Sequence, residues 1–182
     1  MNRDPDETLV ERCREGDRTA LAALVTRYQR AIYNAAYRVL GNGEDAADVA
    51  QSVFLRVAER LDDFDAQRRF FSWIYRIAIN EALNVLRRNG HEEPLGERDE
   101  LPGAESLDPE RRARHSELAG RVQVALMSLR FDDRIVITLR HFSGCSYGEI
   151  ASILELQEKT VKSRLFEARQ RLRGLLKDFQ PA

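Results

Sequence analysis

The stretch that decides the fold, residues 146–177, reads SYGEIASILELQEKTVKSRLFEARQRLRGLLK. At its start, Ser146 and Glu149 have the spacing of a capping box, in which the two side chains satisfy backbone donors at the beginning of a helix. We predict a short helix over 147–154, a turn at 155–157 and a longer helix beyond it. In the longer helix the apolar residues recur every three or four positions, the period of a buried helix face. They are Val161, Leu165, Ala168 and Leu172.

The other face of the longer helix is basic. Between residues 159 and 177 there are seven basic residues and one acid, Glu167. In a helix-turn-helix the second helix enters the major groove, where its first turns meet base edges and its basic side chains neutralise phosphates. We therefore interpret 146–177 as a reader of duplex DNA. The alternative is an ordinary pair of helices with a solvated basic face.

A different composition precedes this module. Residues 89–113 contain three Pro, three Gly and a surplus of acid with almost no large apolar residues, which indicates a flexible linker. On both sides of it the apolar residues have helical spacing, and the β-branched run 135–138 stands between flanks that favour a short helix. The expected fold class is all-α, with two small helical domains joined by a flexible linker.

A helix expected over 44–61 has a mixed outer face. Five residues fall on the side opposite its buried valines. They are Asp48, Gln51, Ser52, Leu55 and Glu59. An exposed leucine among acids and amides indicates a protein-binding face with a polar rim, or a solvent face with one apolar residue.

A second helix, expected over 70–88, combines aromatic, basic and amide side chains on one stripe. They are Trp73, Arg76, Asn80, Asn84 and Arg87. Aromatic and guanidinium planes stack on unpaired bases, at about 1–3 kcal/mol per base. Binding of single-stranded nucleic acid is one interpretation of this stripe. The other is that the aromatic residues belong to the core.

Together these patterns resemble the sigma-70 family of bacterial transcription initiation factors, and within it the small extracytoplasmic-function (ECF) group. Residues 44–55, EDAADVAQSVFL, are similar to region 2.2, which grips the coiled coil of the polymerase β′ subunit. Residues 71–80, FSWIYRIAIN, are similar to region 2.3, which helps to melt the −10 element. Residues 146–151 and 160–165 are similar to region 4, which reads the −35 element.

The resemblance implies a region 2 domain over 1–88, the acidic linker over 89–113 and a region 4 domain over 114–182. It also implies three sets of contacts. Those to core polymerase are Asp45, Asp48, Gln51, Ser52 and Leu55. Those to the −10 element, with a loop that captures a flipped-out base, are Asp62, Asp63, Phe64, Arg68, Arg69, Trp73, Arg76, Asn80, Asn84 and Arg87. Those to the −35 element are Ser146, Tyr147, Lys159, Thr160, Lys162, Ser163, Arg164, Phe166 and Arg169.

The same resemblance implies the partners. The chain is expected to bind core RNA polymerase through its β′ and β subunits, to direct initiation at promoter DNA, and to be held inactive by an anti-sigma factor in the cytoplasm. The alternative is a free-standing helix-turn-helix regulator that binds its operator as a dimer and needs no polymerase face.

Some positions depart from the family pattern. Asn84 stands where Asp is common, and Arg130-Phe131 replaces a Leu-Pro pair. Glu155 occupies a turn position that Gly usually holds, so we expect another turn geometry there. Gln157 replaces a Ser or Thr cap, which weakens the start of the second helix by about 1 kcal/mol.

Other classes of function are excluded. There is no P-loop or nucleophile-elbow pattern, and the three histidines have no Cys or carboxylate at ligand spacing, so we expect no catalytic residue, metal or cofactor. No apolar run reaches the ~20 residues of a membrane span, and the N-terminus lacks the apolar segment of a secretory signal. Cys13 and Cys145 form no CxxC pair and are expected to be buried or incidental thiols.

Overall fold

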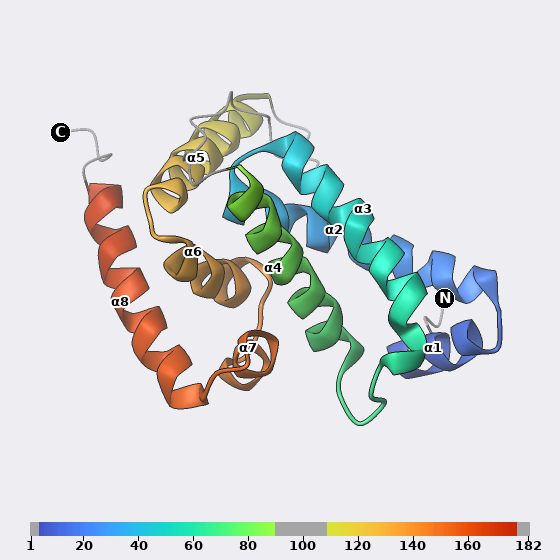
Figure 1. Cartoon of the computed structure of the whole chain (residues 1–182). Helices are drawn as coiled ribbons and strands as arrows, with labels where there is room; N and C mark the ends of the chain where they lie inside the picture. The colour runs from blue at the N-terminus through green and yellow to red at the C-terminus, as the bar shows by residue number, and fades with distance from the viewer. Residues whose placement is uncertain (1–3, 90–108, 178–182) are drawn as a thin grey trace.

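The computed structural model describes residues 4–89 and 109–177, and in these ranges it contains helices and turns without β-strands (Figure 1). The all-α prediction is confirmed. The elements in chain order are α1 (Asp6–Arg14), α2 (Arg18–Leu40), α3 (Gly43–Arg60), the 3₁₀ turn η1 (Leu61–Asp63), α4 (Phe70–Arg88), α5 (Pro109–Met127), α6 (Phe131–Ile137), the π turn η2 (Thr138–Phe142), α7 (Tyr147–Leu154) and α8 (Glu158–Lys177).

Local signals set the boundaries of the N-terminal helices. Asp17 caps α2 by accepting from the backbone N–H groups of Thr19 and Ala20, and Asn42 caps α3 in the same way. Gly41 ends α2 with φ of +76°, a left-handed conformation that glycine adopts at low cost. The helices α2, α3 and α4 then pack around a core of aliphatic and aromatic side chains, with α1 against α2.

The C-terminal helices form the expected helix-turn-helix. Ser146 and Glu149 make a complete capping box at the start of α7. The β-branched run lies in α6 and η2, where Ile135, Val136 and Ile137 are buried, so the helical prediction for it is confirmed. The expectation of another turn geometry at Glu155 is wrong: Glu155 adopts the left-handed conformation that glycine usually supplies, with φ of +54°.

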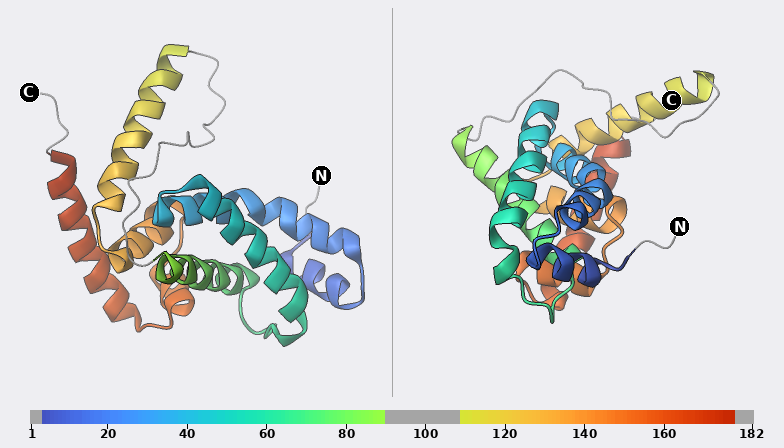
Figure 2. Two further views of the ribbon diagram at one scale, coloured as in Figure 1. Left: turned by 45° about the horizontal axis from the view of Figure 1, so that its top comes forward. Right: turned by 90° about the vertical axis from the view of Figure 1, so that its right-hand side faces the viewer.

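The two halves of the chain lie side by side and share one hydrophobic cluster. Helix α7 packs against α4, while α5, α6 and η2 pack against α2 (Figure 1). Figure 2 shows that α5 meets this body through its C-terminal end and projects away from it at the other. The predicted picture of two independent domains therefore omitted a contact between them.

The linker prediction is tested only at its edges. Residues 90–108 lie outside the described residues. Helix α5 begins at Pro109, so the last part of the predicted 89–113 linker is helical, which corrects its C-terminal boundary.

Candidate nucleic-acid interface

The outer face of α3 is open to solvent. Asp48 and Gln51 are exposed, and the side chain of Leu55 is 57% exposed, although Val53 on the opposite side of the helix is fully buried. Asp45 and Ser52 are half-buried at the edge of this face. The contacts of α3 are with α2, α4 and η1, all on its other side, so the packing of the two halves leaves the outer face uncovered.

The loop between η1 and α4 is held by a residue that the sequence reasoning missed. The guanidinium of Arg14 donates to the carbonyl oxygen of Leu61 at 3.0 Å and also to that of Phe64. Carbonyl groups in a loop have no partner in a helix or a sheet, so these partly buried hydrogen bonds from the guanidinium fix where the loop runs. No sequence signal marked Arg14, because its partners are backbone atoms from a segment far along the chain.

One predicted DNA contact needs correction. The Phe64 side chain is only 4% exposed and packs against Phe70 and Trp73, with ring centroids 5.7 Å and 5.1 Å away. A ring enclosed in this way supports the loop and cannot stack on a base in this conformation. We therefore remove Phe64 from the candidate contacts. Its position in the family's base-capturing loop gave no information on burial.

The remaining −10 candidates are more accessible. Trp73 is half-buried, because one side of its ring packs on the aromatic cluster. Arg76 is also half-buried. The others are exposed in the loop and along α4. They are Asp62, Asp63, Arg68, Arg69, Asn80, Asn84 and Arg87.

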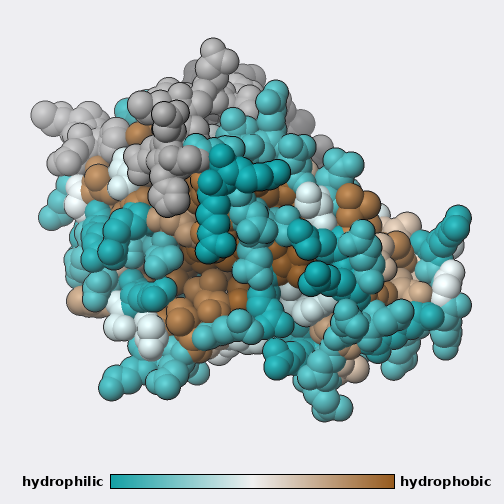
Figure 3. Space-filling view, viewed as in Figure 1, coloured by the Kyte–Doolittle hydropathy of each residue, from teal (hydrophilic) through white to brown (hydrophobic). Residues whose placement is uncertain are grey.

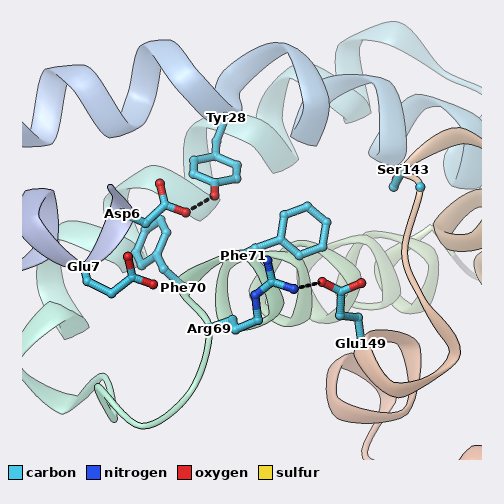
Figure 4. Close-up of a pocket in the computed structure, with 9 residues that line it drawn as sticks. Asp6, Glu7, Tyr28, Arg69, Phe70, Phe71, Ser143 and Glu149 are labelled. Carbon is cyan, nitrogen blue, oxygen red and sulfur yellow. Dashed lines mark hydrogen bonds and ion pairs between the residues drawn. The ribbon is translucent and has the colours of Figure 1, made fainter. Parts of the chain in front are cut away.

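The start of α4 borders a small cavity of about 280 Å³ between α1, α2 and the segment before α7 (Figure 4). In it Asp6 accepts from the hydroxyl of Tyr28, and Arg69 pairs with Glu149. Burial and the Asp6 carboxylate raise the pKa of Tyr28. Hydrogen bonds from Ser146, together with the nearby Arg69 cation, lower the pKa of Glu149. The carboxylates of Asp6 and Glu149 in this cavity are thus already partnered within the chain.

The basic face of α8 is accessible over its length. Lys159, Lys162, Ser163, Phe166 and Arg169 are exposed, and Phe166 is exposed by 64%, the highest value among the large hydrophobic side chains of the described residues. Thr160 and Arg164 are half-buried, and Arg164 lies 3.6 Å from the Asp132 carboxylate. An aromatic ring held in solvent between basic residues suits contact with a thymine methyl group in a groove.

Two further groups shape this face. The Nε of Arg169 donates to Nε2 of His141 at 3.0 Å, and partial burial beside the Arg169 cation lowers the pKa of His141. Sequence reasoning excluded His141 as a metal ligand and did not mark this contact. Tyr147 is half-buried beneath Lys162, whose Nζ lies 5.6 Å from the ring centroid. The hydroxyl of Ser146 is exposed, but its first role is the capping box.

The structure thus brings the predicted residues together as three separate surfaces, on α3, on α4 with its preceding loop, and on α8. Among the described residues no group of three or more His, Cys, Asp or Glu side chains could hold a metal ion. Within the same ranges, no helix is both long and apolar enough to cross a bilayer.

Each half of the chain matches a known sequence family. Residues 24–92 match the sigma-70 region 2 family, and residues 119–172 match the sigma-70 region 4 family. The RNA polymerase sigma-H factor of Pseudomonas aeruginosa is 34% identical over 179 residues, 93% of each chain. The ECF RNA polymerase sigma-E factor of Escherichia coli K12 is 38% identical over 174 residues, 91% of each chain.

Two solved structures resemble this one. CnrH, determined in complex with the cytosolic domain of CnrY, is 30% identical with a TM-score of 0.76, over 97% of this chain and 100% of that one. The sigma factor RpoE from Bartonella quintana, determined in complex with the anti-sigma factor NepR, is 26% identical with a TM-score of 0.64, over 85% of this chain and 92% of that one. Both likenesses extend over the two halves.

Proposed function

Because the chain belongs to the sigma-70 family and to its ECF group of RNA polymerase sigma factors, we propose that it directs initiation through three distinct surfaces on one helical scaffold. In this proposal the outer face of α3 binds core polymerase, α4 with the loop before it binds the melted −10 strand, and the basic face of α8 reads the −35 duplex. The observation that carries the proposal is that all three surfaces are built from exposed and half-buried side chains on separate helices.

The polymerase surface combines charge with one apolar anchor. Asp45 and Asp48 supply the acidic rim, Gln51 and Ser52 supply hydrogen-bonding groups, and Leu55 is the exposed apolar side chain of this face. Protein interfaces commonly have this anatomy of an apolar centre and a polar rim. An acidic rim suits a basic partner surface, which we assign to the β′ coiled coil of core polymerase, with β contacts from the rest of the chain.

The two DNA surfaces differ in the form of DNA that they suit. On α4, the half-buried Trp73 and the exposed amides of Asn80 and Asn84 suit unpaired bases, which offer both a π-face and free edges. On α8, basic residues and Phe166 lie along the second helix of the helix-turn-helix, and a helix in this position fits the major groove. The proposed domains, 1–88 and 114–182, each contain one of these surfaces.

Control by a partner protein is part of the proposal. The relatives CnrH and RpoE were each determined with a bound protein, named for RpoE as an anti-sigma factor. We expect such a partner for this chain, which would act in the cytoplasm, where core polymerase is found. We assign no catalytic residue, cofactor or metal.

The test is run-off transcription from a genomic promoter library with bacterial core polymerase. Transcripts that require both core polymerase and this chain, and that disappear with Asp48→Lys/Gln51→Lys, would support the proposal. A matched control is Glu11→Lys/Glu15→Gln at the C-terminal end of α1, which makes the same total charge change on exposed residues outside the three surfaces. Tight, sequence-specific DNA binding by the chain alone, without any polymerase-dependent transcript, would favour the free-standing regulator.

A further inference from the structure

Two of the proposed −10 arginines are already occupied, by carboxylates from the other half of the chain. Arg69 pairs with Glu149 through Nη1 and Oε1, and Nη1 of Arg76 lies 2.5 Å from Oε1 of Glu155. The members of each pair are about eighty residues apart in sequence, so both are contacts between the two halves. Figure 4 shows the first pair, with Glu149 reaching from α7 to Arg69 at the start of α4.

The two pairs form a matched set. Arg69 immediately precedes α4 and Arg76 lies two turns into it, about 10 Å further along the axis. Glu149 lies in the first turn of α7 and Glu155 caps its end, about 9 Å away. The first carboxylate meets the first arginine and the second meets the second, so an ion pair ties each end of α7 to the start of α4.

Each carboxylate is held in place by its own half of the chain. Oε2 of Glu149 accepts from the backbone N–H of Ser146 at 2.8 Å, which leaves Oε1 for Arg69. Glu155 is the only non-glycine residue with positive φ among the described residues. The turn therefore carries an acidic side chain where glycine would fit with less strain, and that side chain is directed to Arg76.

Other contacts hold the same interface together without charge pairing. The Nε2 of Gln123 donates to the carbonyl oxygen of Tyr37 at 3.1 Å, and this amide is buried. The guanidinium of Arg38 lies 4.0 Å from the centroid of the Phe142 ring. Apolar side chains gather where α4 faces α6 and α7 (Figure 3). The closed arrangement thus combines two ion pairs with packing and one buried hydrogen bond.

The other two proposed surfaces are left free by this closure. The outer face of α3 and the basic face of α8 keep their exposed residues, including Leu55 and Phe166. The ion pairs therefore act selectively on the −10 surface.

We propose that Glu149 and Glu155 form an intramolecular latch that occupies Arg69 and Arg76 in the free chain, in place of the phosphates of the −10 strand. This inference rests on the proposed function, since it takes both arginines to be −10 contacts. Carboxylates and phosphates are both anionic oxygen acceptors for guanidinium groups, so the strand and the latch compete for the same donors. The chain binds single-stranded DNA fully only after α7 has left α4.

The test uses the full chain and a fluorescein-labelled pool of random 20-nucleotide single-stranded DNA, with affinity measured by fluorescence anisotropy. The first variant is Glu149→Gln/Glu155→Gln, in which glutamine preserves the capping-box geometry at position 149. The matched control is Glu11→Gln/Glu15→Gln, which removes the same charge from exposed positions at the C-terminal end of α1. The second variant, Gln123→Ala, weakens the interface without changing any charge.

Exposed ion pairs are individually weak, so we expect the latch variant to bind the pool about three- to tenfold more tightly than the control variant. We expect Gln123→Ala to tighten binding as well, and small-angle scattering to give a larger radius of gyration for both. Affinities equal to the control, with an unchanged radius of gyration, would overturn the latch.

Failure of the latch can be told apart from failure of the proposed function. Arg76→Ala is made both in the parent chain and in the latch variant. If this substitution weakens binding to the pool but the glutamines alone had no effect, Arg76 is a DNA contact and only the latch is wrong. If Arg76→Ala has no effect in either background, the −10 assignment of the α4 surface is wrong, and the latch with it.

Discussion

Replacing Glu155 by glycine should make the helix-turn-helix more stable, although it removes an ion pair. Glu155 is held at φ of +54°, where a side chain with a Cβ is disfavoured by about 1–2 kcal/mol relative to glycine. About 0.5–1 kcal/mol of this gain in stability is offset, because the unfolded chain of the glycine variant has more conformational freedom. The lost pair with Arg76 contributes only a few tenths of a kcal/mol, since the Glu155 side chain is 72% exposed.

The effect of the backbone conformation at residue 155 can be isolated from that of the ion pair by comparing two variants that both lack the charge. Glu155→Gln loses the ion pair and keeps the strain, whereas Glu155→Gly loses both. We expect Glu155→Gly to be about 0.5–1 kcal/mol more stable than Glu155→Gln, which for a chain of this size corresponds to a Tm higher by about 1–4 °C.

The assay is thermal and urea unfolding of the full chain, followed by circular dichroism. The latch adds a second expectation: the glycine variant should be more stable and also more open, with a larger radius of gyration than the parent chain. If Glu155→Gly is less stable than Glu155→Gln, the backbone at this turn is unstrained and the reasoning fails.

Three further predictions concern other sites. Phe166→Ala should lower polymerase-dependent transcription roughly five- to tenfold with little change in Tm, because the ring is 64% exposed. Leu165→Ala at the adjacent buried position should instead lower the free energy of unfolding by about 2–5 kcal/mol, and an equal loss of stability in both variants would contradict the assignment. Burial raises the pKa of Cys145 to about 12, so iodoacetamide at pH 8 should label Cys13 in the folded chain and Cys145 only in urea. Peptide mass spectrometry measures both, and rapid labelling of Cys145 in the folded chain would refute this. Burial and the Arg169 cation lower the pKa of His141 below 6.5, so the imidazole binds a proton more readily in the unfolded chain than in the folded one. The contribution of His141 to stability is therefore lost as the pH falls below 6.5, and an NMR titration midpoint above 6.5 would contradict this.

Local sequence signals predicted the helices well because their causes are local. The capping box of Ser146 and Glu149, the cap at Asp17 and the bounds of α4 all depend on residues within a few positions of one another. The three surfaces could be found for a similar reason, since helical periodicity alone sorts side chains onto faces.

The contacts that the sequence did not reveal join distant segments. Nothing in the local pattern connects Arg14 with the carbonyl of Phe64, or Arg76 with Glu155. The error at Phe64 has the same origin, because a family position identifies a loop but does not say which of its rings the aromatic cluster encloses. At Glu155 the sequence marked an unusual residue correctly, but the turn kept its geometry and accepted the strain.

The pattern of open and occupied surfaces also implies an order of events. The proposed polymerase contacts Leu55 and Asp48 on α3 are exposed while the two halves are still packed together. In the proposed latch, Arg69 and Arg76 become available only when the two halves separate, and that separation also breaks the buried hydrogen bond between Gln123 of α5 and Tyr37 of α2. A ligand shifts such an equilibrium only by its difference in affinity for the two states. The outer face of α3 is equally exposed in the closed and the open state, so a ligand that binds only there has the same affinity for both states. Binding at α3 alone therefore leaves the latch closed. Polymerase must therefore also contact a part of the chain that only the open state presents, or the melted strand must supply the difference.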